Sequence, residues 1–382
     1  MTKKRIFTVA GTRPEAIKMA PVYLELKKSE SLEPFLLATA QHRQMLDQAF
    51  AVFGVNPEFD LNLMRPDQDL AGLTSRLLES VTALLIAEKP DAVLVQGDTT
   101  TAFTSALAAF YAGIPVGHVE AGLRTYDSLS PWPEEMNRRL ISPLSRWSFP
   151  PTGTSKAHLL SEKIPEDQVH ITGNTVVDAL LRVSEKVAAI PESKMLGRSG
   201  VPTEFWEQFG SGRWILVTGH RRESFGGGFD GICRAIADIT QKFPDVGILY
   251  PVHLNPNVQE PVERLLGDNQ NVALIDPCPY EEFVWLMSKC YFILSDSGGV
   301  QEEAPSLGKP ALVMRDTTER PEGVEAGTCR LVGTDPTTIV AAASELLGDV
   351  AEYERRSQLQ NPYGDGQASR RIREVLEADL TK

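Results

Sequence analysis

Cysteine is scarce in this sequence, and long apolar runs are absent. The four cysteines, Cys233, Cys278, Cys290 and Cys329, have neither CxxC spacing nor a nearby pair of histidines, which argues against a zinc site. A disulfide framework is not expected in a chain of this length without a secretory context. No stretch approaches the roughly 20 apolar residues of a membrane span, and the apolar run at residues 6–10 is too short for the core of a signal peptide. We therefore expect a cytoplasmic protein.

Positive charge is also scarce. The chain carries 38 Lys and Arg against 51 Asp and Glu, a formal net charge of −13. Nucleic acids and anionic membranes attract basic patches, so this balance argues against both as partners. An anionic small ligand remains compatible if a few cations are gathered locally. The length of 382 residues fits two domains, since a domain takes roughly 100–200 residues.

Short apolar runs alternate with helical patterns in both halves of the chain. In the first half we predict strands at residues 6–10, 35–39, 92–96 and 115–119, with helices at 14–28, 42–53, 70–88 and 100–112. In the second half we predict strands at residues 214–218, 247–251, 272–275, 291–294 and 311–313, with helices at 229–243, 258–266 and 300–307. Continuous apolar strands separated by helices are typical of parallel sheets covered on both faces.

The pattern predicts an α/β fold of two Rossmann-like, doubly wound domains. We place the boundary after a strand at residues 169–172, which gives domains 1–174 and 175–364, and we predict a loop-bearing segment at residues 191–212. Ligands of such sheets bind at the carboxyl ends of the strands, so the cleft between the domains is the expected active site.

Residues 11–15, Gly-Thr-Arg-Pro-Glu, directly follow the first predicted strand. Gly11 permits a tight strand-to-helix turn, and Pro14 suits the start of a helix. The free N–H groups of that helix terminus, together with Arg13, favour an anion, and Lys18 lies one turn further on. The alternative is an ordinary turn with a solvated arginine.

Three carboxylates follow predicted strands or begin a helix in the first half: Asp98, Glu120 and Glu134. Taken singly they are weak signals, because Asp98 could cap the next helix and Glu134 could complement the dipole of the helix that Pro133 opens. Together, in a chain without a metal motif, they are typical of general acid and base groups at one edge of a sheet.

Two polar motifs in the second half predict a phosphate site. His220, with Arg221 and Arg222, ends the first strand there and suits a phosphate or a leaving group, unless the segment is only a surface loop with internal ion pairs. Residues 295–304 join a strand to a helix through Gly298 and Gly299, so the backbone can approach a diphosphate. Glu303 could then bind ribose hydroxyls, and Arg320 could pair with Glu303 or with the ligand. The alternative is a tight turn before a solvated acidic helix.

These motifs resemble those of the bacterial non-hydrolysing UDP-N-acetylglucosamine 2-epimerases, from residues 11–21 to residues 361–367. The resemblance implies a glycosyltransferase-B-like fold whose final helix, within residues 365–382, packs back on the first domain. It implies interconversion of UDP-N-acetylglucosamine and UDP-N-acetylmannosamine by elimination and re-addition of UDP through 2-acetamidoglucal. It also implies a homodimer and a reaction without cofactor or metal.

The resemblance assigns roles to individual residues. It implies acid and base positions at Asp98, Glu120 and Glu134, with His220 beside the diphosphate. It implies nucleotide contacts at Arg13, Lys18, Phe283, Ser297, Gly298, Gly299, Glu303 and Arg320. Cys278 stands where some members have a glutamine beside the uracil, which leaves only a backbone contact there.

Several members bind a second UDP-N-acetylglucosamine as an activator, and the matching positions are Gln41, Gln44 and His253. Some members place an arginine near the position of Asp67. The negative charge of Asp67 would repel a diphosphate, so the site here would be weak or would use Arg65 instead. The readings left open are a glycosyltransferase of the same architecture, a hydrolysing epimerase, an epimerase of a diacetamido uronic acid, and a nucleotide-sugar binding protein without catalysis.

Overall fold

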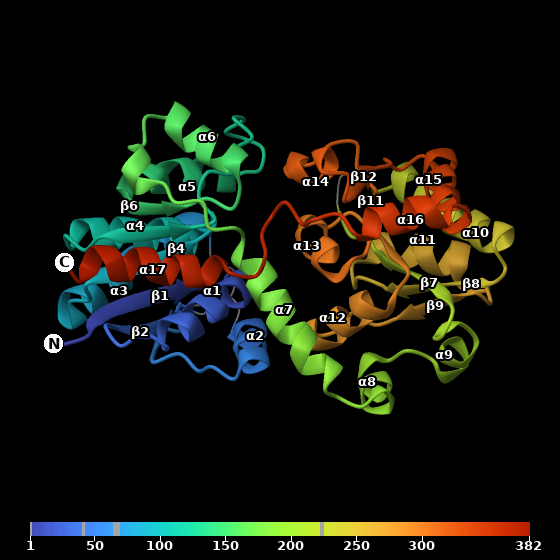
Figure 1. Cartoon of the computed structure of the whole chain (residues 1–382), viewed down its shortest axis with the longest axis horizontal. Coiled ribbons are helices and arrows are strands. Elements are labelled where there is room, and N and C mark those ends of the chain that lie inside the picture. The colour runs from blue at the N-terminus through green and yellow to red at the C-terminus, as the bar shows by residue number, and fades with distance from the viewer. Residues whose placement is uncertain (1, 40–42, 64–68, 222–224) are drawn as a thin grey trace. The chain divides into compact units, whose positions relative to one another are not determined.

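The chain forms two compact α/β units (Figure 1). The computed structural model describes residues 2–39, 43–63, 69–221 and 225–382, and for Arg43 and Gln44 it describes the backbone alone. The first unit comprises Met1–Ala179 together with Tyr363–Lys382, and the second comprises Leu180–Pro362. The first unit therefore contains both ends of the chain.

The first unit is built on a six-stranded parallel sheet in the order β3-β2-β1-β4-β5-β6. Its strands are β1 (Lys4–Ala10), β2 (Leu32–Ala38), β3 (Phe59–Asp60), β4 (Ala92–Gln96), β5 (Val116–Val119) and β6 (Ser145–Phe149). Its helices are α1 (Arg13–Leu26), α2 (Arg43–Phe53), α3 (Leu70–Glu88), α4 (Thr100–Tyr111), α5 (Glu134–Ile141), α6 (Gly153–Ser161) and α17 (Ala368–Leu380), and α7 (Thr175–Ala188) leads out of it.

Both faces of this sheet are buried, because successive side chains of a strand point to opposite faces. Ile6 of β1 packs in a cluster with Met19 of α1 and Ile372 of α17. Its neighbour Phe7 packs in the opposite cluster, with Val81 of α3 and Ala106 of α4. Helices therefore cover the sheet on both sides, and the terminal helix α17 is part of the core of the first unit (Figure 1).

Helix α3 is long and apolar enough to cross a membrane by length and composition alone, and no other described helix is. The expectation that no stretch of the sequence approaches the length and apolar character of a membrane span was therefore wrong for this segment. A single such helix is weak evidence, since core helices pass the same test. Leu73, Leu77, Val81 and Leu85 recur at helical spacing and are buried, so α3 presents one apolar stripe to the sheet.

The second unit has another six-stranded parallel sheet, in the order β12-β11-β10-β7-β8-β9. Its strands are β7 (Arg213–Thr218), β8 (Val246–Pro251), β9 (Val272–Ile275), β10 (Phe292–Ser295), β11 (Ala311–Val313) and β12 (Cys329–Leu331). Its helices are α8 (Glu192–Ser199), α9 (Thr203–Phe209), α10 (Gly227–Lys242), α11 (Pro256–Leu266), α12 (Tyr280–Lys289), α13 (Gly298–Glu303), α14 (Pro321–Glu325), α15 (Pro336–Gly348) and α16 (Val350–Ser357). The prediction of two doubly wound α/β sheets is confirmed.

Two local predictions were wrong. Residues 191–212 are not mainly loop: Pro191 and Pro202 stand just before α8 and α9, and Gly200 ends α8 with a φ of 73°. Proline fits the start of a helix and glycine its end, so the composition that indicated a loop marks helix boundaries instead. Residues 169–172 do not form a strand, since Val169 makes only an isolated bridge to Ser148.

Candidate active site

The turn between β1 and α1 is locked by a buried carboxylate. Thr12 caps α1, and Glu15, which is 1% exposed, accepts hydrogen bonds from the N–H groups of Gly11 (3.0 Å) and Thr12 (2.7 Å). Thr99, in the turn after β4, donates a hydrogen bond from its hydroxyl to Glu15 at 2.6 Å. Burial raises the pKa of Glu15, and these hydrogen bonds oppose the rise. The capping box thus joins the turns after β1 and β4, and so positions what they carry.

Asp98 lies in the turn after β4 and faces an arginine. The helix α4 is capped by Thr99, which accepts from the N–H of Ala102 at 3.0 Å, so Asp98 is not the N-cap. Its Oδ2 lies 2.8 Å from Nη2 of Arg138 on α5. Burial raises the pKa of Asp98; Arg138 opposes the rise, and Glu120 adds to it. Asp98 is therefore a carboxyl group that holds its proton more readily than an exposed aspartate does.

Glu120 ends β5 in a strained backbone conformation. Its φ of 63° lies in the left-handed region, which residues other than glycine seldom adopt. Lys18 donates to both of its oxygens, at 2.8 and 2.6 Å, and the Gln96 amide donates to the second of them. Glu120 as a whole is 6% exposed. A cation and an amide thus hold Glu120 in one orientation at the carboxyl edge of the first sheet.

Glu134 is the first residue of α5, and its neighbour on that helix has a different environment. Glu134 is half-buried, and its charge is one of those that raise the pKa of Asp98. Glu135 is wholly buried and accepts from the N–H groups of Thr125 and Tyr126, both at 3.1 Å. The sequence predicts Asp98, Glu120 and Glu134 at one edge of the sheet, and electrostatic effects on Asp98 arise from both of the other two.

Sequence reasoning missed two supporting side chains at this edge, Arg138 and His118. Arg138 is buried and pairs with Asp98. The His118 ring lies with Nε2 2.7 Å from the carbonyl of Gly97, so Nε2 carries the proton, since a carbonyl only accepts. Burial lowers the pKa of His118 to about 4, and the ring is neutral near pH 7. Both residues lie inside motifs that the sequence singled out. Only the arrangement of β4, β5 and α5 in the fold places Arg138 against Asp98 and His118 against Gly97.

In the second unit, the turn after β7 carries His220. Asp296, which follows the adjacent strand β10, accepts from the backbone N–H groups of His220 (2.7 Å) and Arg221 (2.8 Å). The rings of His220 and His253 are stacked, with centroids 5.4 Å apart. Burial lowers the pKa of His220, while Asp296 raises it. His220 thus lies at the carboxyl edge of the second sheet.

The glycine-rich turn after β10 lies at the same edge. The N–H of Ser297 donates to the Ser295 hydroxyl at 3.0 Å, and α13 begins at Gly298. A Cβ on Gly298 would lie 2.9 Å from the guanidinium carbon of Arg320, so glycine lets that side chain lie against the turn as it does here. Glu303 is buried at the end of α13 and accepts from the Tyr280 hydroxyl at 2.6 Å. Tyr280 is a contact that sequence reasoning missed.

The Nε–H group of Arg320 donates a hydrogen bond to Glu302 at 2.8 Å, whereas the sequence suggested a pair with Glu303 or with the ligand. Three arginines form ion pairs with Glu319: Arg315 at 2.8 Å, Arg221 at 3.7 Å and Arg320 at 3.8 Å. Burial alone would raise the pKa of Glu319, but Arg315 and Arg320 lower it to about 2. A chain with a strong negative balance thus holds a local cluster of guanidinium groups, as an anion site requires.

The other predicted site residues are less closely defined. Arg13 is half-buried at the start of α1, and Phe283 is half-buried in the first turn of α12. Cys278 donates to the Ser199 carbonyl at 3.5 Å, and burial raises the pKa of its thiol to about 11. Gln41 lies outside the described residues, as do Arg65 and Asp67, and the side chain of Gln44 is not described. Within the described ranges, no group of three or more His, Cys, Asp or Glu residues is placed to hold a metal ion.

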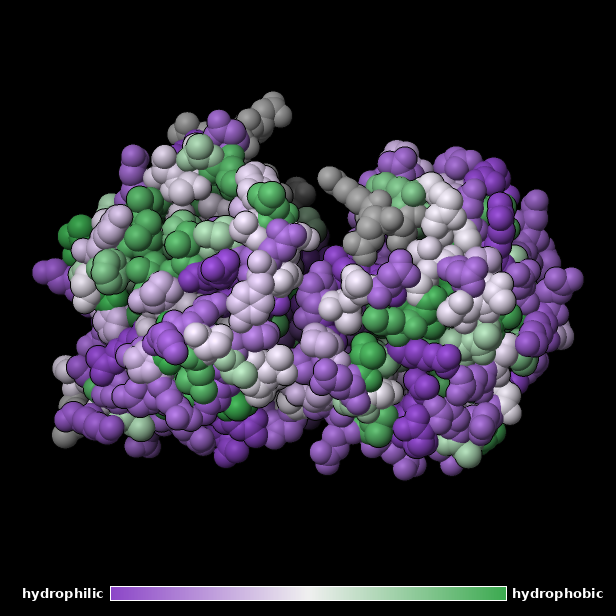
Figure 2. Space-filling view, turned by 90° about the horizontal axis from the view of Figure 1, so that it is seen from above, coloured by the Kyte–Doolittle hydropathy of each residue, from purple (hydrophilic) through white to green (hydrophobic). Residues whose placement is uncertain are grey.

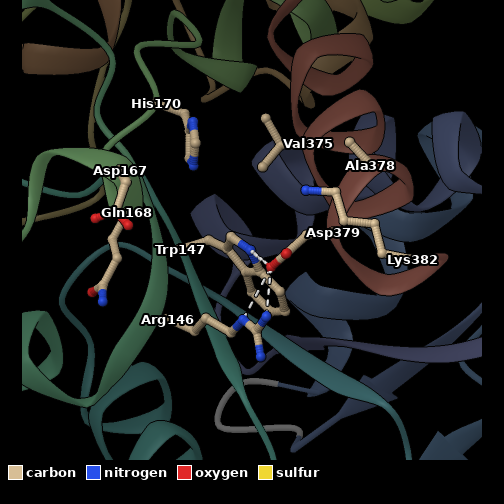
Figure 3. A pocket seen from close by; sticks show the side chains of 9 residues that line it. All are labelled: Arg146, Trp147, Asp167, Gln168, His170, Val375, Ala378, Asp379 and Lys382. Atoms are coloured by element: carbon tan, nitrogen blue, oxygen red, sulfur yellow. Dashed lines mark hydrogen bonds and ion pairs between the residues drawn. The ribbon is translucent and has the colours of Figure 1, made fainter.

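A cavity of about 660 Å³ lies elsewhere on the first unit (Figure 3). It is lined by Arg146, Trp147, Asp167, Gln168, His170, Val375, Ala378, Asp379 and Lys382. Arg146 and Trp147 stand at the amino end of β6, and Asp379 of α17 accepts from both. The carboxylates follow the carboxyl ends of β4 and β5, so this cavity is not their site.

The fold defines a two-domain α/β protein of the glycosyltransferase-B class. The crystal structure of the glycotransferase of kitacinnamycin has the same fold, with a TM-score of 0.64 over 98% of this chain and 99% of that chain. At 14% sequence identity this likeness shows the fold alone.

The family is shown by closer matches. The sequence model of UDP-N-acetylglucosamine 2-epimerase matches residues 24–377. The UDP-N-acetylglucosamine 2-epimerase of Escherichia coli K12 is 55% identical over 372 residues, which are 97% of this chain and 98% of that protein. The crystal structure of the Neisseria meningitidis enzyme bound to UDP-GlcNAc is 50% identical, with a TM-score of 0.89 over 98% of this chain and 100% of that chain. The chain therefore belongs to the UDP-N-acetylglucosamine 2-epimerase family of enzymes, and the resemblance carried by its motifs is confirmed.

Proposed function

We propose that this enzyme interconverts UDP-N-acetylglucosamine and UDP-N-acetylmannosamine without hydrolysis, by eliminating UDP to form 2-acetamidoglucal and adding UDP back. The observation that carries the proposal is the pairing of two unlike carboxyl groups at one sheet edge. Glu120 is held by Lys18 and Gln96, whereas burial raises the pKa of Asp98. Groups in environments that differ in this way can divide the roles of acid and base between them.

The chemistry explains why the reaction needs both a nucleotide site and carboxylates. The C2 hydrogen of the sugar is not next to a carbonyl, so direct removal of that proton would be prohibitive. Departure of UDP from C1 leaves positive character there, and a carboxylate then takes the C2 proton to give the glycal. Protonation of the opposite face and return of UDP to C1 give the epimer.

The second unit supplies the features that a UDP group requires. Ser297, Gly298 and Gly299 form the glycine-rich turn, and Glu303 is a buried acceptor suited to ribose hydroxyls. Arg320 and the arginines around Glu319 favour the diphosphate and stabilise it as a leaving group. Relatives were crystallised bound to UDP-GlcNAc, in Neisseria meningitidis, and with UDP, in Staphylococcus aureus. We assign the nucleotide to this unit on these grounds.

The product formed from UDP-N-acetylglucosamine in deuterated water tests the reaction. Because the C2 proton is lost and regained, the UDP-N-acetylmannosamine formed should carry deuterium at C2, which proton NMR detects. Free N-acetylmannosamine would indicate a hydrolysing epimerase instead. A product that keeps its original C2 hydrogen would exclude the elimination mechanism, and no change without an acceptor would favour a transferase or a binding protein.

Removing Arg320 or Glu303 should weaken UDP binding. Arg320→Ala deletes a charge-assisted contact, worth roughly 10- to 100-fold in Kd, and Glu303→Ala deletes the ribose acceptor. Calorimetry with UDP measures both, and Arg330→Ala, which loses only an exposed pair with Glu345, is the matched control. Unchanged affinity in both Arg320→Ala and Glu303→Ala would place the nucleotide site elsewhere.

Activation by a second UDP-N-acetylglucosamine stays a prediction. Of Gln41, Gln44 and His253, only His253 has a described side chain; it is exposed and stacks on His220. A ligand on His253 would therefore act directly on the ring of His220. With UDP-N-acetylmannosamine alone, activation should appear as a lag that a trace of UDP-N-acetylglucosamine abolishes; linear progress from the start would exclude it.

The homodimer also stays a prediction, and an apolar surface supports it. Ile86 of α3 and Phe110 and Tyr111 of α4 are each more than half exposed, and α3 packs along α4. Figure 2 shows hydrophobic patches between hydrophilic ones on the first unit, at the left. Exposed apolar patches are typical of protein interfaces. Sedimentation as a monomer at micromolar concentration would contradict the dimer.

A further inference from the structure

Asp296 is a buried carboxylate at the carboxyl edge of the second sheet, and its role is not explained by the fold alone. It is 0% exposed and directly follows β10. Its Oδ2 accepts two backbone hydrogen bonds from the turn after β7, from His220 at 2.7 Å and Arg221 at 2.8 Å. Those two bonds hold the main chain of the turn, and they use one of the two carboxylate oxygens.

The other oxygen faces the imidazole. Oδ1 of Asp296 lies 3.4 Å from Nδ1 of His220, and no described residue gives it a hydrogen bond. A buried carboxylate oxygen without a donor is costly, so a nearby donor should approach it. The Nδ1–H group needs to move only roughly 0.5 Å to reach ordinary hydrogen-bond length, and such contacts often tighten when a substrate binds.

We propose that Asp296 is a positioning residue for His220: Oδ1 accepts the Nδ1 proton, so that Nε2 is the ring nitrogen that gains and loses the proton facing the leaving diphosphate. This rests on the proposed function. When Nε2 is protonated, it donates a hydrogen bond to the phosphate oxygen on which negative charge grows as UDP leaves. His253 stacks at 16° to the ring and limits its tilt.

The groups that face His220 set the direction of its titration. Burial lowers the pKa of His220, Asp296 raises it, and His253 and Arg221 lower it. Asp296 is thus the group that favours the imidazolium form against the others. Its removal should move the pKa of His220 further down, and should leave fewer molecules in the imidazolium form near neutral pH.

The tautomer of His220 in the unaltered enzyme is the direct test. Protein labelled with ¹⁵N-histidine would be titrated by NMR, and the signal missing from His220→Gln assigns the residue. We expect Nδ1 to keep its proton while Nε2 titrates. A neutral His220 protonated at Nε2, in an enzyme that still makes the epimer, would overturn this inference and leave the proposed function standing.

Asp296→Asn gives the second test. The amide oxygen can still accept from the backbone N–H groups of the turn, but the NH₂ group then faces Nδ1 and forces the proton onto Nε2. By analogy with other carboxylates that orient histidines, kcat should fall roughly 10- to 100-fold, with UDP affinity unchanged and the tautomer switched. Asp335→Asn, which replaces the exposed N-cap of α15 by an equally good cap, should change none of these. Wild-type kcat together with an unswitched tautomer in Asp296→Asn would overturn the proposal.

Discussion

Replacing Glu120 by glutamine should lower kcat by roughly 100-fold or more, while the folded structure is kept. Glutamine preserves the shape of the side chain but cannot take a proton. It would also leave the ammonium of Lys18, now 2.6 and 2.8 Å from the two carboxylate oxygens, facing a neutral amide. Asp98→Asn should have a similar effect, since it removes the proton-holding carboxyl group that faces Arg138. Glu134→Gln should lower kcat to a similar extent if Glu134 takes part in proton transfer.

The measurement is steady-state kinetics with UDP-N-acetylglucosamine, with circular dichroism to check folding. Asp91→Asn is the matched control, because Asp91 immediately precedes β4, at the opposite end of the strand from Asp98, and makes only partly exposed contacts with Lys4 and Arg5. It should keep wild-type kcat. A near-normal kcat in any of the three variants would remove that carboxylate from the proton-transfer scheme.

Gly11→Ala should destabilise the first unit and disturb the turn between β1 and α1. A Cβ on Gly11 would lie far closer than van der Waals contact to the hydroxyl oxygens of both Thr101 and Thr39, and both residues are buried. Neither threonine can move freely, because the hydroxyl of Thr39, which follows β2, pairs at 3.2 Å with that of Thr101 in the first turn of α4. Overpacking of this kind costs about 1–3 kcal/mol. The displaced turn also carries the N–H groups that hold Glu15, so activity should fall as well.

Urea unfolding measures the stability change, and Gly153→Ala provides its control. A Cβ on Gly153 would meet no atom within 4 Å, and the residue begins α6, so alanine there should be neutral or slightly stabilising. Equal midpoints for Gly11→Ala and the wild-type chain would show that the turn relaxes more easily than its contacts indicate.

The sequence was sufficient to place the candidate residues at strand ends, because strand, turn and helix signals are local. Gly11, Pro14 and the run at residues 92–96 have the expected positions, and so does the glycine-rich turn at Gly298. The pairings could not be predicted in the same way. Lys18 and Glu120 are 102 residues apart, and His220 and Asp296 are 76 apart. Only the order of the strands in each sheet brings such residues together.

Two kinds of element were missed for different physical reasons. The strand β6 interrupts its apolar residues with serine and arginine, and its buried serines are polar side chains that no hydropathy pattern reveals. Helices α8 and α9 are short and flanked by proline and glycine, so their end signals outweigh their interiors. Length alone did not decide the outcome, because α7, of 14 residues, and α15, of 13 residues, were not predicted either.

The order of the two units along the chain has a consequence for dissecting the protein. The second unit, Leu180–Pro362, is an uninterrupted stretch inserted into the first, whose closing segment returns at Tyr363. The N–H of Asn174, a few residues before the chain leaves the first unit, donates to the carbonyl of Tyr363 at 2.7 Å, so the chain returns close to where it left. A gene fragment can therefore encode the second unit directly. The carboxylate-bearing half needs a short designed linker across the excised insertion, and a stop codon before α17 would strip Ile372 and Leu376 from its interior.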